Sequence, residues 1–366
     1  MSVQMPDYEN CGVNVVSSIA QYCGMTPLHK THPFTDALLQ KKEYQNIILM
    51  LFDGMGVDLL QKALPEDAFL RRHLQHTLSA VFPSTTTCAT TAIECGQMPR
   101  EHGWLGWTLR FPQIQQSVDV YTNHNDRGEI AASYHVGNRF IPRDFIYPHI
   151  TACGRFKACS ISPFGDVKIN TLPELIDKAI TLAKDSEKRY MYCYWPEPDS
   201  SMHRYGCYHE KSIAKLADIN DRVEKMVSQL PEDTLLLLTA DHGLIDADIR
   251  YLDHYPDLMK MLEFDATLEL RAVSFHVKPE WKKAFPETFK RCFEDHFRLV
   301  TKNEFIETYL GSGAIRENVY DTVGDYVAIS LDEVTLMNHM PSFLQIGHHA
   351  GLTKQEMQVP LIVAKE

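Results

Sequence analysis

The sequence predicts an α/β protein with a mainly parallel sheet sandwiched by helices, and three observations support this prediction. Short apolar runs of strand length alternate with amphipathic helical patterns along most of the chain. This alternation is typical of strand–helix–strand units, which build parallel sheets. Acidic, histidine or threonine residues follow several of the apolar runs, as expected where ligands gather at the carboxyl ends of parallel strands.

The individual elements follow from local pattern. An unbroken apolar run of four to seven residues predicts a strand buried on both faces, and apolar residues at a spacing of three and four predict a helix. In chain order these elements are strand 47–52, a helix of about four turns from 171, strand 190–195, helix 210–230, strand 235–238 and strand 359–363.

A change of pattern between residues 246 and 346 predicts an accessory lobe. Short strands and one helix replace the alternation there. We expect residues 1–245 and 347–366 to form the core, with 246–346 inserted as a small α+β cap. Arg271 in this cap is expected at its surface. The segment 110–166, rich in aromatic residues, glycine and proline, is expected to form loops near the site.

Composition limits the partners and the compartment. The 366 residues include 48 acidic and 36 basic ones, a formal net charge of −12, which argues against binding to nucleic-acid polymers or anionic membranes. An anionic substrate would need local positive charge, such as a metal ion. Nine cysteines without a CxxC pair favour free thiols, and the N-terminus has no signal-peptide pattern. We therefore expect a cytoplasmic protein acting on a small molecule, with no prediction of oligomeric state.

Carboxylates and imidazoles follow three predicted strands. Asp53 comes directly after the first strand. Asp199 and His203 are spaced i, i+4, which places them on one face of a helical turn. Asp241 and His242 are adjacent and precede a glycine that lets the backbone bend. Aspartate and histidine are common zinc ligands, although each pair alone also fits a turn or a helix cap.

A run of threonines contains the candidate nucleophile. In FPSTTTCATTAIECG the small residues after the run predict a helix packed closely on the sheet, with Thr85, Thr86 or Thr87 at its N-terminus. An alcohol there faces unpaired amides, which suits attack on a phosphate, and N-capping is the plainer alternative. Metal coordination is one way to activate such a hydroxyl. Farther along, HHAG offers His348 and His349 as further ligands.

Five motifs in this order resemble the alkaline phosphatase superfamily, specifically its type I phosphodiesterase and nucleotide pyrophosphatase branch. They are LMLFDGMG, FPSTTTCATTAIECGQMPREHG, WPEPDSSMHRYG, TADHG and HHAGLTKQEMQVPLIV. The resemblance implies two divalent metal ions, zinc or alternatively manganese, that clamp the attacking and leaving oxygens. It assigns one ion to Asp53, Asp241, His242 and the threonine oxygen, and the other to Asp199, His203 and His349.

The resemblance also selects among the open alternatives. The family spacing from proline to nucleophile indicates Thr86, and the family pattern His-Gly-Gly indicates His349 rather than His348. It implies a two-step hydrolysis in which Thr86 attacks phosphorus, expels the leaving group and is then freed by water. Ala89 stands where relatives commonly have a phosphoryl-binding asparagine, which leaves the substrate class open.

Three further residues are expected near the substrate. The backbone amide of Thr87 could bind a phosphoryl oxygen, and Trp104 and Trp107 could stack on a base or an apolar leaving group, with core packing as an equal alternative. We predict a hydrolase that cleaves phosphodiester or pyrophosphate bonds of nucleotide-like substrates, since no arginine follows Thr86 closely. The alternatives are a phosphomonoesterase, mutase or phosphonate hydrolase on the same frame, and a non-catalytic metal- or anion-binding relative.

Overall fold

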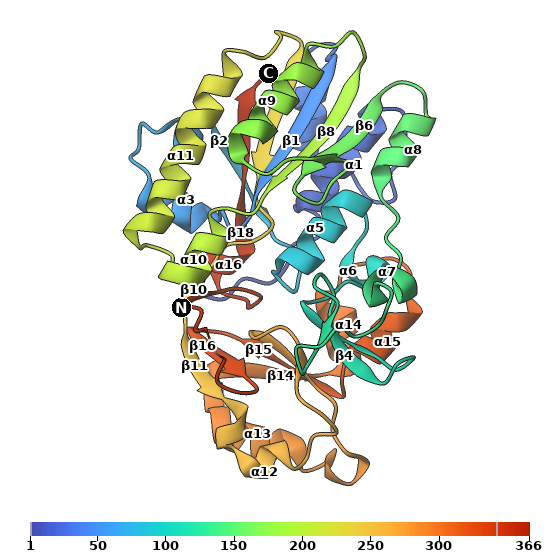
Figure 1. Ribbon diagram of the computed structural model, residues 1–366, viewed down its shortest axis with the longest axis vertical. Coiled ribbons are helices and arrows are strands. Elements are labelled where there is room, and N and C mark those ends of the chain that lie inside the picture. The colour runs from blue at the N-terminus through green and yellow to red at the C-terminus, as the bar shows by residue number, and fades with distance from the viewer. Residues whose placement is uncertain (1, 342) are drawn as a thin grey trace.

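Two seven-stranded sheets, one in each lobe of the computed structural model, organise the chain (Figure 1). The structure describes residues 2–341 and 343–366. The first sheet consists, in spatial order, of β2 (Leu74–Ser79), β18 (Gln358–Lys365), β9 (Thr234–Thr239), β1 (Asn46–Phe52), β8 (Arg189–Trp195), β6 (Lys157–Ser162) and β7 (Val167–Lys168). Its strand order places β1 at the centre.

The first sheet is mixed rather than uniformly parallel. Strand β1 pairs in parallel with β8 and β9, and β6 pairs in parallel with β7 and β8. Strand β18 is antiparallel to both β2 and β9. The predicted α/β class is confirmed, whereas the predicted mainly parallel sheet describes only the part from β9 to β7. The apolar pattern of β18 shows that it is a strand but contains no information on its direction.

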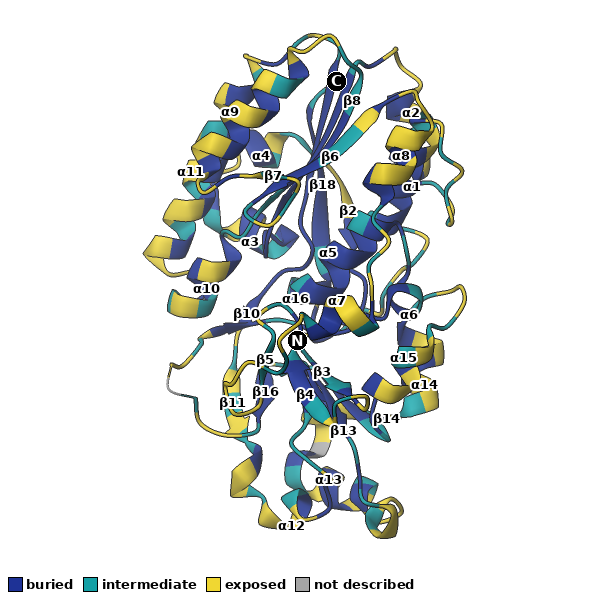
Figure 2. Ribbon diagram, turned by 45° about the vertical axis from the view of Figure 1, so that its right-hand side comes forward, coloured by how far each residue is buried: buried dark blue, intermediate teal, exposed yellow. Residues whose placement is uncertain are grey.

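Helices cover both faces of the first sheet. Figure 1 shows one layer that contains α9 and α11 and another that contains α1 and α5. The first layer comprises α3 (Val57–Ala63), α4 (Phe69–Arg72), α9 (Leu172–Ala183) and α11 (Glu210–Val227), and the second comprises α1 (Gly12–Tyr22), α2 (Pro33–Leu39), α5 (Thr86–Cys95) and α8 (Ile146–Ala152). Because helices shield both faces, all residues of β1 and β9 are buried (Figure 2). The described helices include none long and apolar enough to cross a membrane.

The second sheet is antiparallel and draws on two distant segments. Its strands, in spatial order, are β14 (Phe297–Thr301), β15 (Tyr326–Ser330), β13 (Ala272–Phe275), β12 (Thr267–Leu268), β3 (Thr108–Phe111), β4 (Gln116–Asp119) and β5 (His124–Asn125). Residues 108–125 were expected partly as loops, which is wrong for β3, β4 and β5, because strands this short show little alternation. The predicted cap boundaries at 246 and 346 stay a prediction.

Short elements complete the two lobes. Two small sheets pair β10 (Ile245–Asp246) with β17 (Gly347–His348) and β11 (Asp248–Tyr251) with β16 (Val334–Met337). The remaining α-helices among the described residues are α6 (Pro99–His102), α7 (Val136–Phe140), α10 (Asp199–Tyr205), α12 (Pro256–Met259), α13 (Phe285–Phe293), α14 (Lys302–Tyr309), α15 (Glu317–Thr322) and α16 (Lys354–Met357). Helices α12 and α13 lie at the far end of the second lobe (Figure 1).

Arg271 lies inside the protein rather than at the predicted surface. Its side chain is fully buried and pairs with Glu356 of α16, with Nε 2.7 Å from Oε1 and Nη2 2.9 Å from Oε2. Glu356 also accepts the backbone N–H of Gly351 at 2.7 Å. This buried pair ties the start of β13 to the loop that follows His349.

Candidate active site

The carboxyl ends of three neighbouring strands bring the predicted aspartates together. Asp53 follows β1, Asp199 begins α10 shortly after β8, and Asp241 follows β9. Since β9, β1 and β8 are adjacent and parallel, their ends meet at one edge. Strand β18 runs the opposite way, so its beginning lies at this edge, and the segment with His349 therefore arrives at the same place.

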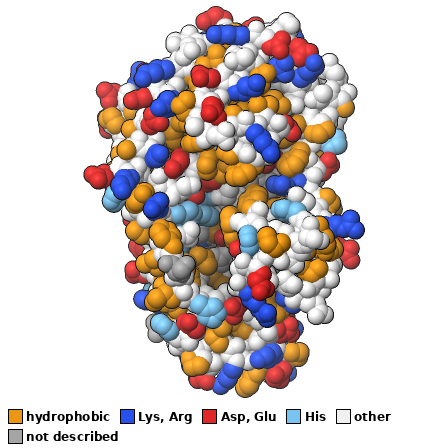
Figure 3. Space-filling view, in the orientation of Figure 1, with side chains coloured by type: hydrophobic (Ala, Val, Ile, Leu, Met, Phe, Trp, Pro, Cys, Tyr) orange, Lys and Arg blue, Asp and Glu red, His pale blue; other side chains and the backbone are white. Residues whose placement is uncertain are grey.

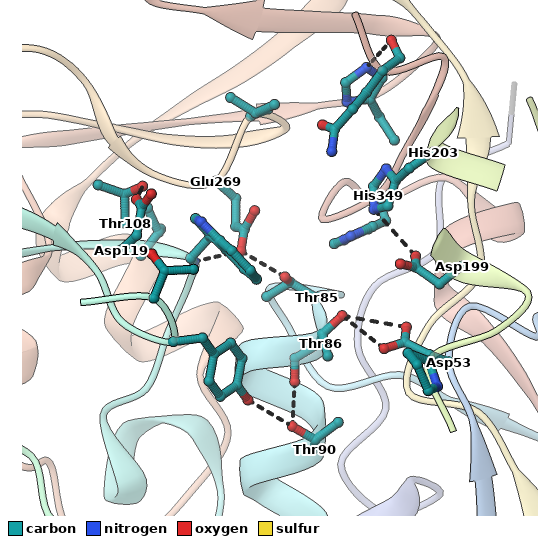
Figure 4. Close-up of a pocket in the computed structure, with 18 of the residues that line it drawn as sticks. Asp53, Thr85, Thr86, Thr90, Thr108, Asp119, Asp199, His203, Glu269 and His349 are labelled. Carbon is teal, nitrogen blue, oxygen red and sulfur yellow. Dashed lines mark hydrogen bonds and ion pairs between the residues drawn. The ribbon is translucent and has the colours of Figure 1, made fainter. Parts of the chain in front are cut away.

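Thr86 points toward this edge from the N-terminus of α5. Its Oγ1 lies 3.4 Å from both carboxylate oxygens of Asp53 and 3.1 Å from Nε2 of His242 (Figure 4). The neighbouring Thr85 points elsewhere, because its hydroxyl donates to Glu269 at 2.7 Å. Thr87 is fully buried, and its hydroxyl has no partner within the described residues. Of the three threonines, Thr86 alone contacts the predicted ligands.

The three candidate histidine ligands share one hydrogen-bonding arrangement. Nδ1 faces a backbone carbonyl in each of them: that of Gly347 at 2.7 Å for His203, that of Gly243 at 3.2 Å for His242, and that of Ser84 at 3.2 Å for His349. A carbonyl can only accept, so each Nδ1 has the proton. Nε2 is left with its lone pair toward the site, which is the usual arrangement of zinc-binding histidines.

Two groups of side chains have the spacing that a metal ion needs. Within each group the possible ligand atoms lie within 4.8 Å of one another. The groups are Asp199, His203 and His349, and Asp53, Asp199 and His242. Asp241 adjoins the second group, with Oδ2 3.5 Å from Nε2 of His242.

Unpartnered buried oxygens also fit a cation. Asp199 Oδ1 and Asp241 Oδ2 are shielded from solvent and have no hydrogen-bond donor within the described residues. The other oxygen of Asp241 accepts backbone N–H groups of Gly54 and His242, both at 3.0 Å. This arrangement orients Asp241 and leaves one oxygen for a ligand, since a buried carboxylate oxygen without a partner is costly.

Among the described residues, no lysine or arginine forms an ion pair with the carboxylates of the site. Burial, together with the neighbouring charges of Asp241 and Asp199, raises the pKa of Asp53 well above its usual value. Burial likewise raises the pKa of Asp199. Burial and the adjacent His242 and His203 lower the pKa of His349 well below its usual value. Divalent cations would favour the ionised carboxylates and the neutral imidazoles, which are the forms that bind metal.

The site opens into a cavity of about 1790 Å³ between the two lobes. Figure 3 shows the hollow, with histidine side chains around its rim. Trp107 lines this cavity and is 41% exposed. Trp104 instead packs in the core: it is fully buried, its indole N–H donates to the carbonyl of Ile141 at 2.7 Å, and it is absent from the described cavity lining. The predicted substrate contact therefore does not match the position of Trp104.

Residues that the sequence analysis missed support the site. Tyr194, near the end of β8, donates its hydroxyl to Asp53 Oδ2 at 2.5 Å. Glu269 accepts both the Thr85 hydroxyl and the backbone N–H of Trp107 at 2.7 Å, and burial raises its pKa to about 7. The position of Tyr194 near the end of a predicted strand could have identified it as a residue of the site. Glu269 follows a two-residue strand whose pattern gives no such signal.

Comparison with known families identifies a phosphoester hydrolase of the alkaline phosphatase superfamily. The family model described as type I phosphodiesterase / nucleotide pyrophosphatase matches residues 47–343. The chain belongs to this family. No curated protein sequence matches the chain.

Solved structures with low sequence identity share the fold. Murine ectonucleotide pyrophosphatase/phosphodiesterase 5, as an inactive threonine-to-alanine variant in complex with AMP, has a TM-score of 0.67 at 15% identity, covering 87% of each chain. The human counterpart has a TM-score of 0.63 at 13% identity, covering 88% of this chain and 90% of that one. Phosphonoacetate hydrolase from Sinorhizobium meliloti 1021, in complex with phosphonoformate, has a TM-score of 0.64 at 15% identity, with the same coverage of 88% and 90%.

Proposed function

We propose that the chain is a two-metal hydrolase that cleaves phosphodiester or pyrophosphate bonds of small nucleotide-like molecules through a covalent threonine intermediate. The position of Thr86 is the observation that supports this most strongly. Its hydroxyl stands at a helix N-terminus, within 3.4 Å of Asp53 and 3.1 Å of His242. The family membership supports phosphoester hydrolysis independently of this geometry.

The ligand set fits two divalent ions. One would be held by Asp53, Asp241, His242 and the Thr86 oxygen, and the other by Asp199, His203 and His349. Three histidines with carboxylates favour zinc, with manganese as the alternative. When bound, such ions supply positive charge that stabilises the attacking and leaving oxygens and lowers the pKa of a coordinated hydroxyl.

The protein's own groups position the reaction. The Thr86 oxygen forms a bond to phosphorus while the bond from phosphorus to the leaving oxygen breaks, and the proton lost by Thr86 balances the negative charge of the departing alcohol or phosphate. The free backbone amides at the start of α5, including that of Thr87, face the phosphoryl oxygens and the positive end of the helix dipole favours them. Water then cleaves the phosphothreonine ester and restores the hydroxyl of Thr86. Tyr194 keeps the Asp53 carboxylate in place throughout.

The cavity lining favours diesters over monoesters. Its described residues include two arginines, Arg143 and Arg204, and no lysine. Arg204 is exposed, and Arg143 acts on Tyr121, whose hydroxyl contacts Thr90 one helical turn from Thr86. The second negative charge of a monoester would therefore have no arginine or lysine partner beside Thr86.

We propose a cytoplasmic location on the basis of the nine free cysteines.

Hydrolysis of two chromogenic esters tests this proposal. Metal-stripped protein is refilled with zinc or manganese and assayed with bis-p-nitrophenyl phosphate and p-nitrophenyl phosphate. Metal-dependent turnover that is faster with the diester supports the proposal. Preference for the monoester would support the phosphatase or mutase alternative, and uptake of metal without turnover of either ester would support a non-catalytic binding protein.

A further inference from the structure

The cavity continues from the reacting hydroxyl along one face of α5. Thr86, Thr90 and Glu94 all line it and are spaced i, i+4, i+8. A helix rises about 1.5 Å per residue, so this arm of the cavity follows α5 for about 12 Å. Thr90 marks its middle, where its hydroxyl lies 3.2 Å from the hydroxyl of Tyr121 (Figure 4). The arm is therefore long enough for the part of a substrate that extends away from the phosphate.

An arginine without a protein partner lies at the far end of this arm. Arg143 lines the cavity, and its guanidinium carbon is 4.3 Å from the centre of the Trp104 ring and 5.0 Å from that of Phe145. In the part of the chain that the structure describes, Arg143 makes no hydrogen bond and no ion pair within 4.0 Å, and its Nε is shielded from solvent. The aromatic rings hold the guanidinium in place while leaving its donors free.

A second unpartnered donor lies at the same end. The side chain of Tyr192 is 2% exposed and lines the cavity, yet its hydroxyl has no hydrogen-bond partner among the described residues. Its ring centre is 6.2 Å from that of Tyr147, whose hydroxyl donates to Glu94 at 3.0 Å. Buried hydroxyls normally have partners, so this one is available to a ligand oxygen.

Other groups near Arg143 do not satisfy its charge. The charge of Arg143 acts on Glu94, but the Glu94 carboxylate accepts from Tyr147 and forms no ion pair with Arg143 among the described residues. Burial raises the pKa of Glu94 to about 7 even though Arg143 lowers it, so the carboxyl is partly protonated near neutral pH and can donate to a ligand oxygen. His135 also faces Arg143, and burial keeps its pKa below the usual value.

We infer that the far end of this arm is a binding subsite for an anionic oxygen group, a carboxylate or a second phosphate, separated by a spacer from the phosphorus that Thr86 attacks. Arg143 supplies the charge-assisted donors and Tyr192 a neutral one. This subsite rests on the proposed function, because it needs the reacting phosphate to lie at Thr86. The group that stays bound to phosphorus when the leaving group departs would extend into this arm. The subsite would therefore favour diesters in which that group ends in a negative charge over diesters in which it is uncharged.

Binding of two ligand series tests the subsite without relying on turnover. Isothermal titration calorimetry on zinc-loaded protein compares ω-phosphonoalkanoates of graded length with the alkylphosphonates of equal length. The phosphonate occupies the metal site in both series, so the ratio of the two Kd values reports the distal carboxylate alone. We expect the best-fitting phosphonoalkanoate to bind about tenfold tighter than its alkyl counterpart.

Variants then assign the preference to Arg143. Arg143→Met, which keeps the aliphatic stem against the rings, should reduce the ratio to within about twofold. Arg139→Met, at an exposed position four residues away, is the matched control and should keep it. Equal binding of both series to the wild type at every length overturns the subsite while leaving the proposed function standing. Failure of both series to bind zinc-loaded protein overturns both.

Discussion

Removing the guanidinium of Arg271 should destabilise the protein far more than removing a surface arginine. Arg271 and Glu356 are both fully buried and form a bidentate pair, at 2.7 and 2.9 Å. Arg271→Met would leave the Glu356 carboxylate buried without a counterion. Because Glu356 also holds the backbone N–H of Gly351, two residues beyond His349, the perturbation reaches the segment that contains a proposed metal ligand.

The loss of unfolding free energy in Arg271→Met depends on which hydrogen-bond donors remain for the groups that Arg271 contacts. The carbonyls of Asp332 and Val334, which accept from Arg271, also lie 3.2 and 2.8 Å from the Ser330 hydroxyl. That hydroxyl has one proton, so only one of the two carbonyls keeps this donor in the variant, and the main loss remains the charge partner of Glu356. Breaking a buried ion pair from one side costs about 3–5 kcal/mol. The remaining donors to Glu356 from Gly351 and Thr353 place the expected value near the lower end.

Urea unfolding of the metal-loaded protein measures this loss. The matched control is Arg222→Met, which breaks the surface pair with Asp218 and should cost less than about 1 kcal/mol. The double variant Arg271→Met/Glu356→Leu should recover part of the stability, since it removes the unpaired charge. If the unfolding free energies of Arg271→Met and Arg222→Met agree within about 1 kcal/mol, the buried pair does not have the role assigned to it.

Three further predictions concern the site. Thr86→Ala should keep its metal content but lose diester turnover by roughly a thousandfold or more, whereas Thr85→Ala should remain within about tenfold; the opposite kinetic pattern would move the nucleophile. His349→Ala should lose one of two ions on metal analysis, and His348→Ala should keep both. Glu94→Gln should flatten the pH dependence of the unfolding free energy. Because the folded pKa of Glu94 is raised from 4.5 to about 7, the wild type loses stability as pH rises through that range. Equal slopes of unfolding free energy against pH for the wild type and the variant would contradict this.

The sequence predicted which side chains meet because strand ends are a strong constraint. Unbroken apolar runs locate β1, β8 and β9, and parallel neighbours must end at one edge. The sequence therefore predicts that Asp53, Asp199 and Asp241 lie together. His348 is distinguished from His349 by its Nε2, which faces the carbonyl of Gln345 at 3.2 Å. That detail agrees with the family pattern, although the metal-binding roles themselves stay predictions.

The local pattern of apolar and polar residues contains no information on which distant segments pair with each other. The joining of β12 to β3 brings Glu269 beside Thr85 and Trp107, and nothing in either local segment indicates this contact. The burial of Arg271 could not be predicted for the same reason, because its partner Glu356 lies 85 residues away. Strand direction in β18 likewise depends on how the chain returns from the second lobe.

Zinc titration with two simultaneous readouts tests the central claim most directly. Metal-stripped wild type and Thr86→Ala are titrated with zinc while bound metal and hydrolysis of bis-p-nitrophenyl phosphate are recorded together. We predict that wild-type turnover rises with metal and saturates at two ions per chain, and that Thr86→Ala binds two ions without turnover. Wild-type protein that binds two ions and remains inactive, or Thr86→Ala that stays active, would contradict a two-metal hydrolase acting through Thr86.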